Sequence, residues 1–195
     1  DVILYLCGLL TVKGGTNKIV EYFGPGAETI SATGKGTICN MGAELGATTS
    51  VFPFDQKMVA YMNIMDRADL ASFAQSHKEL LVADPEVYQS PEKYYDQIVE
   101  VDLSKLEPHV VGPHTPDLAR PISKLAAEAK EKGYPVELKA ALIGSCTNSS
   151  YEDIERLAVK NGIAPIGKGS INIESGTWSS IGNGVYIRNY SWGYT

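Results

Sequence analysis

The segment 144–153, GSCTNSSYED, constrains the fold of this chain more than any other stretch. It follows an apolar run at 136–143 that is typical of a buried strand, and it precedes apolar residues at helical spacing from Ile154 onward. Cys146 is therefore expected where a strand passes into a helix. Helix, strand, turn and helix in series favour a layered α/β fold whose site lies at the carboxyl end of the strand.

The helix after this turn is expected to begin at Ser149 or Ser150. Each serine is followed three residues later by a carboxylate, Glu152 or Asp153, which is the spacing of a capping box. Cys146 would then lie just ahead of a helix N-terminus, where free N–H groups and the helix dipole favour the thiolate. A thiolate there is a nucleophile or a metal ligand, and a small buried residue in a turn is the alternative. Position alone leaves both open.

A glycine-rich helical pattern spans 33–45, with Thr33 as the expected N-cap and Gly46 just past its end. Each of its internal glycines would cost about 1 kcal/mol in an exposed helix, so another group is expected to approach this backbone closely. Asn40 and Glu44 are four residues apart and are predicted to project from one face. Together they could hold a water, a hydroxide or a substrate hydroxyl, and a solvated polar face is the alternative.

The remaining pattern predicts mostly helices. Asp55 and Asp66 are expected to cap two helices whose apolar stripes belong to the core. Prolines and glycine at 107–116 predict a linker with a domain boundary nearby. The other expected elements are helices at 1–11 and 121–132 and strands at 19–23, 98–103, 170–173 and 184–187.

Composition excludes some classes of function. The formal net charge is −6 and no basic cluster is present, which argues against a nucleic-acid-binding domain. No apolar run reaches membrane-spanning length. The three cysteines form no close pair, which indicates a reducing compartment, and Cys39 is predicted to be buried and structural. His77 is predicted to be a core or boundary residue, and His109 and His114 are predicted to be exposed, rather than metal ligands.

GSCTNSSYED resembles the first iron–sulfur ligand motif of the aconitase family, and TICNMGAELGATTSVFPF at 37–54 resembles a second signature of that family. VKGGT, YFGPG and PHTPDLARP resemble the mitochondrial type of the family, in the same order. The resemblance covers about 1–160. It implies three-layer α/β/α aconitase-like domains, here incomplete: the second domain at 1–107, the start of the third, with the first cluster cysteine, at 108–160, and a divergent tail without family match at 161–195.

The resemblance also implies a chemistry, that of aconitate hydratase, a hydro-lyase of the tricarboxylic acid cycle. Such enzymes interconvert citrate and isocitrate through cis-aconitate, with a 4Fe-4S cluster held by three cysteine thiolates and one iron left open as a Lewis acid. Cys146 matches one cluster ligand, and Asn40 and Glu44 match residues that hydrogen-bond the hydroxyls at the cluster. The expected partners are tricarboxylates, without nucleic acid or membrane, in a mitochondrial monomer.

One thiolate cannot hold such a cluster, so the chain by itself is expected to be inactive. The C-x-x-C pair that the family supplies does not occur in this sequence, and Cys7 and Cys39 do not match it. Three alternatives stay open: a related hydro-lyase acting on homocitrate or isopropylmalate, a non-catalytic truncated or splice product acting as a binding module, and a metal-free, redox-sensitive thiol at Cys146.

Overall fold

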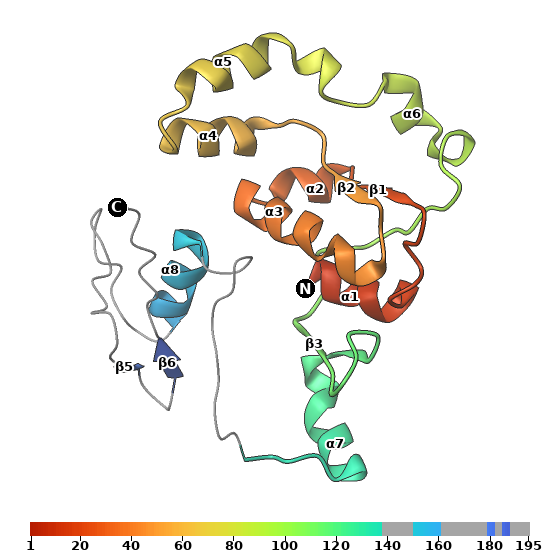
Figure 1. Cartoon of the computed structure of the whole chain (residues 1–195), viewed down its shortest axis with the longest axis vertical. Helices are drawn as coiled ribbons and strands as arrows, with labels where there is room; N and C mark the ends of the chain where they lie inside the picture. Colours follow the sequence, from red (N-terminus) through yellow and green to blue (C-terminus); the bar gives the residue numbers. More distant parts are fainter. Residues whose placement is uncertain (138–149, 161–178, 182–184, 188–195) are drawn as a thin grey trace. The chain divides into compact units, whose positions relative to one another are not determined.

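The computed structural model describes residues 1–137, 150–160, 179–181 and 185–187 (Figure 1). The chain divides into two compact units, Asp1–Lys132 and Gly133–Thr195. The helices of the first unit are α1 (Val2–Leu10), α2 (Pro25–Thr29), α3 (Ala32–Asn40), α4 (Gln56–Ile64), α5 (Ala68–Ser76), α6 (Pro85–Gln89) and α7 (Ile122–Lys132), with 3-10 helices η1 (Met41–Leu45), η2 (Lys78–Leu80) and η3 (Pro91–Lys93). The boundaries at 107 and 160 that the family resemblance implies remain predictions.

Two small sheets complete the first unit. β1 (Ile19–Glu21) and β2 (Thr49–Val51) pair in parallel, and the chain between them passes through α2, α3 and η1. Parallel strands need such a crossover, so the α3–η1 segment is fixed at both ends by one sheet. β3 (His109–Val111) and β4 (Ala119–Pro121) pair antiparallel. Mixed helices and small sheets agree with an α/β class.

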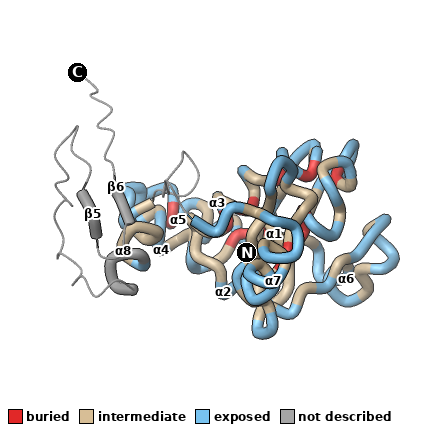
Figure 2. Tube along the Cα trace, turned by 90° about the horizontal axis from the view of Figure 1, so that it is seen from below, coloured by how far each residue is buried: buried red, intermediate tan, exposed pale blue. Residues whose placement is uncertain are grey.

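The core of the first unit lies where α1 meets η1 (Figure 2). Ile3, Leu6 and Cys7 of the apolar helix α1 are buried against Leu45, and each is at most 4% exposed. Asp1 begins α1, as predicted, but its carboxylate does not cap the helix. It accepts a hydrogen bond from the backbone N–H of His109, at 3.0 Å. The core thus joins the first helix to the turn that follows α3.

The middle of the chain differs from expectation at two places, and of these the strand expected at 98–103 is wrong. Residues 98–103 form no strand, although Val99 and Val101 pack against the core. The expected linker contains β3, whose partner strand β4 lies ten residues further on. Both differences concern strand pairing, which depends on contacts with other segments and not on propensity alone.

Helices α4 and α5 form a pair that exposes much apolar surface. Asp55 caps α4 by accepting hydrogen bonds from the N–H groups of Lys57 and Met58, as predicted, whereas Arg67 rather than Asp66 stands at the N-cap of α5. The expected core stripes are largely exposed. The exposed members are Tyr61, Met65, Leu70, Phe73 and Leu81.

In the second unit, α8 (Tyr151–Lys160) and the antiparallel pair β5 (Ser179–Ile181) and β6 (Val185–Ile187) are described. β6 confirms the strand expected at 184–187. The expected strands at 136–143 and 170–173, and the turn with Cys146, lie at least partly outside the described residues. Among the helices that the structure describes, none has the length and apolar character needed to cross a membrane.

Candidate functional site

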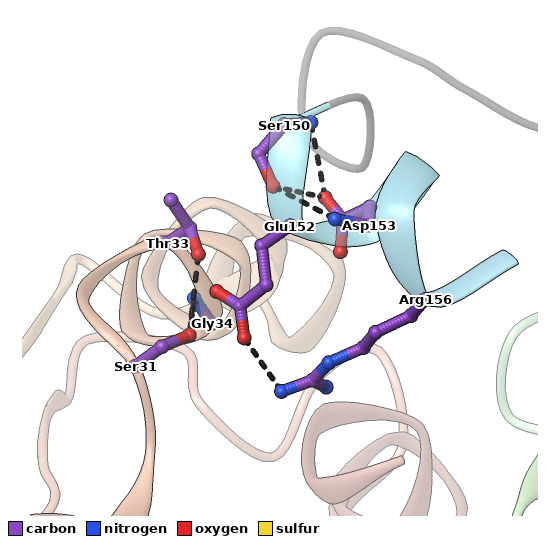
Figure 3. Close-up of polar contacts among 7 residues, drawn as sticks. All are labelled: Ser31, Thr33, Gly34, Ser150, Glu152, Asp153 and Arg156. Atoms are coloured by element: carbon purple, nitrogen blue, oxygen red, sulfur yellow. Dashed lines mark hydrogen bonds and ion pairs between the residues drawn. The ribbon is translucent and has the colours of Figure 1, made fainter. Parts of the chain in front are cut away.

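The predicted helix at 33–45 is two elements. The α-helix α3 ends at Asn40 and continues as the 3-10 helix η1, which Gly46 ends in the left-handed conformation at φ 72°, as predicted. Ser31, not Thr33, is the N-cap: its hydroxyl accepts a hydrogen bond from the N–H of Gly34 at 3.1 Å (Figure 3). The change of helix type at Asn40 governs the geometry of the site.

Asn40 and Glu44 therefore do not share the face that an α-helix would give them. A 3-10 helix has three residues per turn, so side chains four residues apart diverge by about a third of a turn. Asn40 borders a pocket. The charge of the Glu44 carboxylate, after burial, helps to raise the pKa of the Cys7 thiol. Both side chains are exposed.

The pocket opens between the end of α3, η1 and the start of β2. Its volume is about 460 Å³. Its walls offer an amide, hydroxyls and a thiol, which are neutral hydrogen-bonding groups suited to a polar ligand. The lining residues are Cys39, Asn40, Gly42, Ala43, Ala47, Thr48, Thr49 and Ser50.

The two described cysteines differ in position. Cys7 is fully buried in the core, whereas Cys39 is half-buried and borders the pocket, so Cys39 is less buried than expected. Burial raises the pKa of Cys39. Burial, followed by the charges of Glu44 and Asp117, raises the pKa of Cys7. Both shifts favour the neutral thiol over the thiolate that a metal needs.

Two buried hydroxyls belong to Ser50, which lines the pocket, and to Tyr22. They are neighbours, yet neither makes a hydrogen bond of normal geometry. Tyr22 stacks on Phe52, with ring centroids 4.6 Å apart. The expected close approach to the glycine-rich backbone occurs here, because the Ser50 hydroxyl lies against Gly42.

The ionic contact between Lys35 and Asp55 was not predicted from the sequence. Lys35 is 3% exposed, pairs with the carboxylate that caps α4, and lies 5.6 Å from the centroid of the Phe52 ring. A lysine in a glycine-rich helical pattern gave no sign of burial. The predicted capping role of Asp55 was the one available signal, because a cap is a fixed carboxylate that a cation can meet.

The helix after the cysteine motif begins as one of the two alternatives predicted. Ser150 and Asp153 form a reciprocal capping box: the Asp153 N–H donates to the Ser150 hydroxyl at 3.3 Å, and the Ser150 N–H donates to the Asp153 carboxylate at 3.1 Å (Figure 3). Glu152 instead pairs with Arg156. Cys146 itself lies outside the described residues.

The described residues do not by themselves supply the donors of a three-thiolate cluster. Over 1–137, 150–160 and the two short strands, no group of three or more His, Cys, Asp or Glu could hold a metal ion. The His77 ring bonds the carbonyl of Phe73, and the His109 ring bonds that of Glu107. His77 and His109 are half-buried, so His109 is less exposed than expected, while His114 is exposed as predicted.

Comparisons with known proteins agree with the sequence motifs. The sequence model of the aconitase family (aconitate hydratase) matches residues 1–165. The chain is 57% identical over 158 residues to the mitochondrial aconitate hydratase of Candida albicans, and 56% identical over 159 residues to that of Saccharomyces cerevisiae. Each match covers 81% of this chain and 20% of the relative. The chain thus spans about a fifth of the length of these relatives.

Proposed function

The chain belongs to the aconitase family, and from this membership we propose that it is the part of an aconitate hydratase that carries Asn40, Glu44 and one cluster cysteine, Cys146. The observation that carries the proposal is the match of the family over residues 1–165, which includes both motif segments. The complete enzyme would interconvert citrate and isocitrate through cis-aconitate. The names of the relatives support a mitochondrial location.

Asn40 and Glu44 have separate roles in this proposal. The Asn40 amide, at the pocket, both donates and accepts hydrogen bonds and so can orient a hydroxyl or a carboxylate. The exposed Glu44 carboxylate accepts a hydrogen bond from the hydroxyl or water that is removed or added. Their divergence would place them on different sides of the reacting group.

Cys146 would supply one thiolate to a 4Fe-4S cluster. When bound, such a cluster supplies a Lewis acid at its open iron. The sequence has three cysteines, of which Cys7 is fully buried. The chain therefore lacks the donor set, and we propose no reaction step through a cluster on the chain alone. Three-layer α/β/α domains, divided at 107 and 160, belong to the same proposal.

The first test is the activity of the purified chain after reconstitution with iron and sulfide. We expect no cis-aconitate from citrate or isocitrate, measured by its ultraviolet absorbance, and less than stoichiometric iron. Measurable cis-aconitate formation by the purified chain would contradict its predicted inactivity.

The second test is a hybrid in which the matching 159 residues of this chain replace those of the Saccharomyces cerevisiae relative. We expect the hybrid to hydrate cis-aconitate. Asn40→Ala or Glu44→Gln should lower kcat about 100-fold, the usual effect of removing one preorganised polar group. Asn63→Ala and Glu86→Gln, at exposed positions, are the matched controls. A folded but inactive hybrid would favour the non-catalytic alternative.

A further inference from the structure

We propose that the contact between Gly42 and Ser50 positions the turn that carries Asn40 and Glu44. Gly42 belongs to η1 and Ser50 to β2, and both line the pocket. The contact itself is independent of the proposed function, and only its catalytic consequence rests on that function.

Position 42 favours glycine because there is no room for a Cβ atom. Its φ lies outside the left-handed region, unlike that of Gly46, so its backbone suits any L-residue. A Cβ atom at position 42 would lie closer than 3.0 Å to the Ser50 hydroxyl oxygen, a separation that real Cβ atoms do not show. The same atom would lie 3.5 Å from the Ser50 Cβ, which is ordinary van der Waals contact. The single clash is therefore with one hydroxyl.

Strand pairing holds the backbone of Ser50 in this contact. It lies in the middle of β2, opposite Val20 in the parallel pair with β1. Its hydroxyl is buried and makes no hydrogen bond of normal geometry. A buried hydroxyl without a partner costs about 1–3 kcal/mol, so the Ser50 hydroxyl does not itself stabilise the fold.

The rest of the turn is held on its other side. The N–H of Gly15 donates to the carbonyl of Leu45 at 2.8 Å, and the N–H of Ala47 donates to the carbonyl of Gly42 at 3.2 Å. Leu45 is fully buried. Because these hydrogen bonds and the burial of Leu45 restrain this side, we expect a larger residue at position 42 to displace the segment next to the pocket, which contains Asn40.

The test uses the 195-residue chain in a Cys146→Ser background, so that Cys7 and Cys39 are the remaining thiols. The variants are Gly42→Ala, Ser50→Ala and the double variant. Gly36→Ala is the matched control, since a Cβ there would meet nothing within 4 Å. The rate of Cys39 alkylation by iodoacetamide, followed by peptide mass spectrometry, reports how accessible the pocket is. Cys7, which is fully buried, reports unfolding.

We expect Gly42→Ala to raise the Cys39 rate at least about threefold, in the range of couplings between residues in contact. Cys7 should stay protected. The double variant should return to the rate of Ser50→Ala, because the clashing hydroxyl is gone, and Gly36→Ala should change neither rate. If Gly42→Ala unfolds, a folded double variant supports the proposal equally.

An unchanged Cys39 rate in Gly42→Ala, or no recovery in the double variant, would overturn the proposal. Equal acceleration of Cys39 and Cys7 in both variants that carry Gly42→Ala would also overturn it, because it would show general destabilisation. No outcome depends on catalysis. An inactive hybrid would therefore not contradict the proposed contact. An alkylation result that overturns the contact would not contradict the proposed function.

Discussion

The ionisation of Tyr22, which lies next to Ser50, depends on its surroundings. Burial raises its pKa to about 12, the charges of Cys39 and Cys7 act in the same direction, and the neighbouring Ser50 hydroxyl offsets part of the rise. The neutral phenol is therefore favoured in the folded chain. The buried Tyr22 hydroxyl lowers the stability of the fold because it lacks a hydrogen-bond partner. The stacking of Tyr22 on Phe52 acts in the opposite direction.

This shift predicts alkaline destabilisation. The pKa of Tyr22 is higher in the folded chain than its ordinary value of 10.0, so its contribution is complete below about pH 10 and is lost as pH rises through about 12. Urea midpoints should fall less between about pH 9 and about pH 11 in Tyr22→Phe than in the parent chain. Tyr61→Phe, at an exposed position, is the control and should match the parent. An identical fall in Tyr22→Phe would contradict the burial of the phenol.

At the scale of elements, local chemistry was predictable and helix type was not. The Asp55 cap, the Ser150–Asp153 capping box and the end at Gly46 each depend on residues within four positions. The change to a 3-10 helix at Asn40 has no such local signal, and the 3-10 helix ends with a distant contact in which the Gly15 N–H donates to the carbonyl of Leu45. The sequence thus pointed to a segment that lines a pocket, whereas the change of helix type, which alters the relative directions expected for Asn40 and Glu44, required the coordinates.

The ion pair between Lys35 and Asp55 joins α3 to α4. Removing one member of a buried pair leaves an uncompensated charge, at a cost of about 3–5 kcal/mol. Asp55→Asn should cost more than Lys35→Met, because the Lys35 side chain is 4% exposed and that of Asp55 is 16% exposed. The Asp55 carboxylate also keeps its two cap hydrogen bonds in Lys35→Met.

Urea unfolding of both single variants and the double variant measures this pair. The double variant should lose less stability than the two single losses added together. Lys57→Met, at an exposed lysine, is the control. Additive losses would show that the pair contributes nothing to the joining of the two helices.

For the whole molecule, the described surface carries an unusual amount of apolar side chain on α4, α5 and η2. Ile64 and Leu80 are 78% and 74% exposed. Periodicity predicted helices here correctly. It could not show that their apolar stripes are exposed, because the same spacing of apolar residues occurs on buried and on exposed helix faces. Fold class and order of motifs followed from the sequence, whereas burial and strand pairing required the coordinates.

The exposed apolar side chains of α4, α5 and η2 predict that copies of the chain associate. Replacing such side chains should reduce association without lowering the stability of the fold. Ile64→Lys with Leu80→Lys should reduce light scattering of the concentrated chain, because isolated apolar groups no longer meet between molecules. The free energy of unfolding should change by no more than about 0.5 kcal/mol for each substitution. Ala71→Lys, at a residue 2% exposed, is the contrasting control and should destabilise strongly. Equal destabilisation by all three would show that the face is covered.

The hydrogen bond between Asp1 and His109 has a consequence for biosynthesis. Its two residues are 108 positions apart in the chain. At about 5–20 residues per second, the ribosome completes His109 about 5 to 20 seconds after Asp1. During that interval the apolar helix α1 has no strand β3 to lie against. A stalled or prematurely released nascent chain would therefore present α1 to chaperones and proteases, so translation speed sets how long this chain is vulnerable.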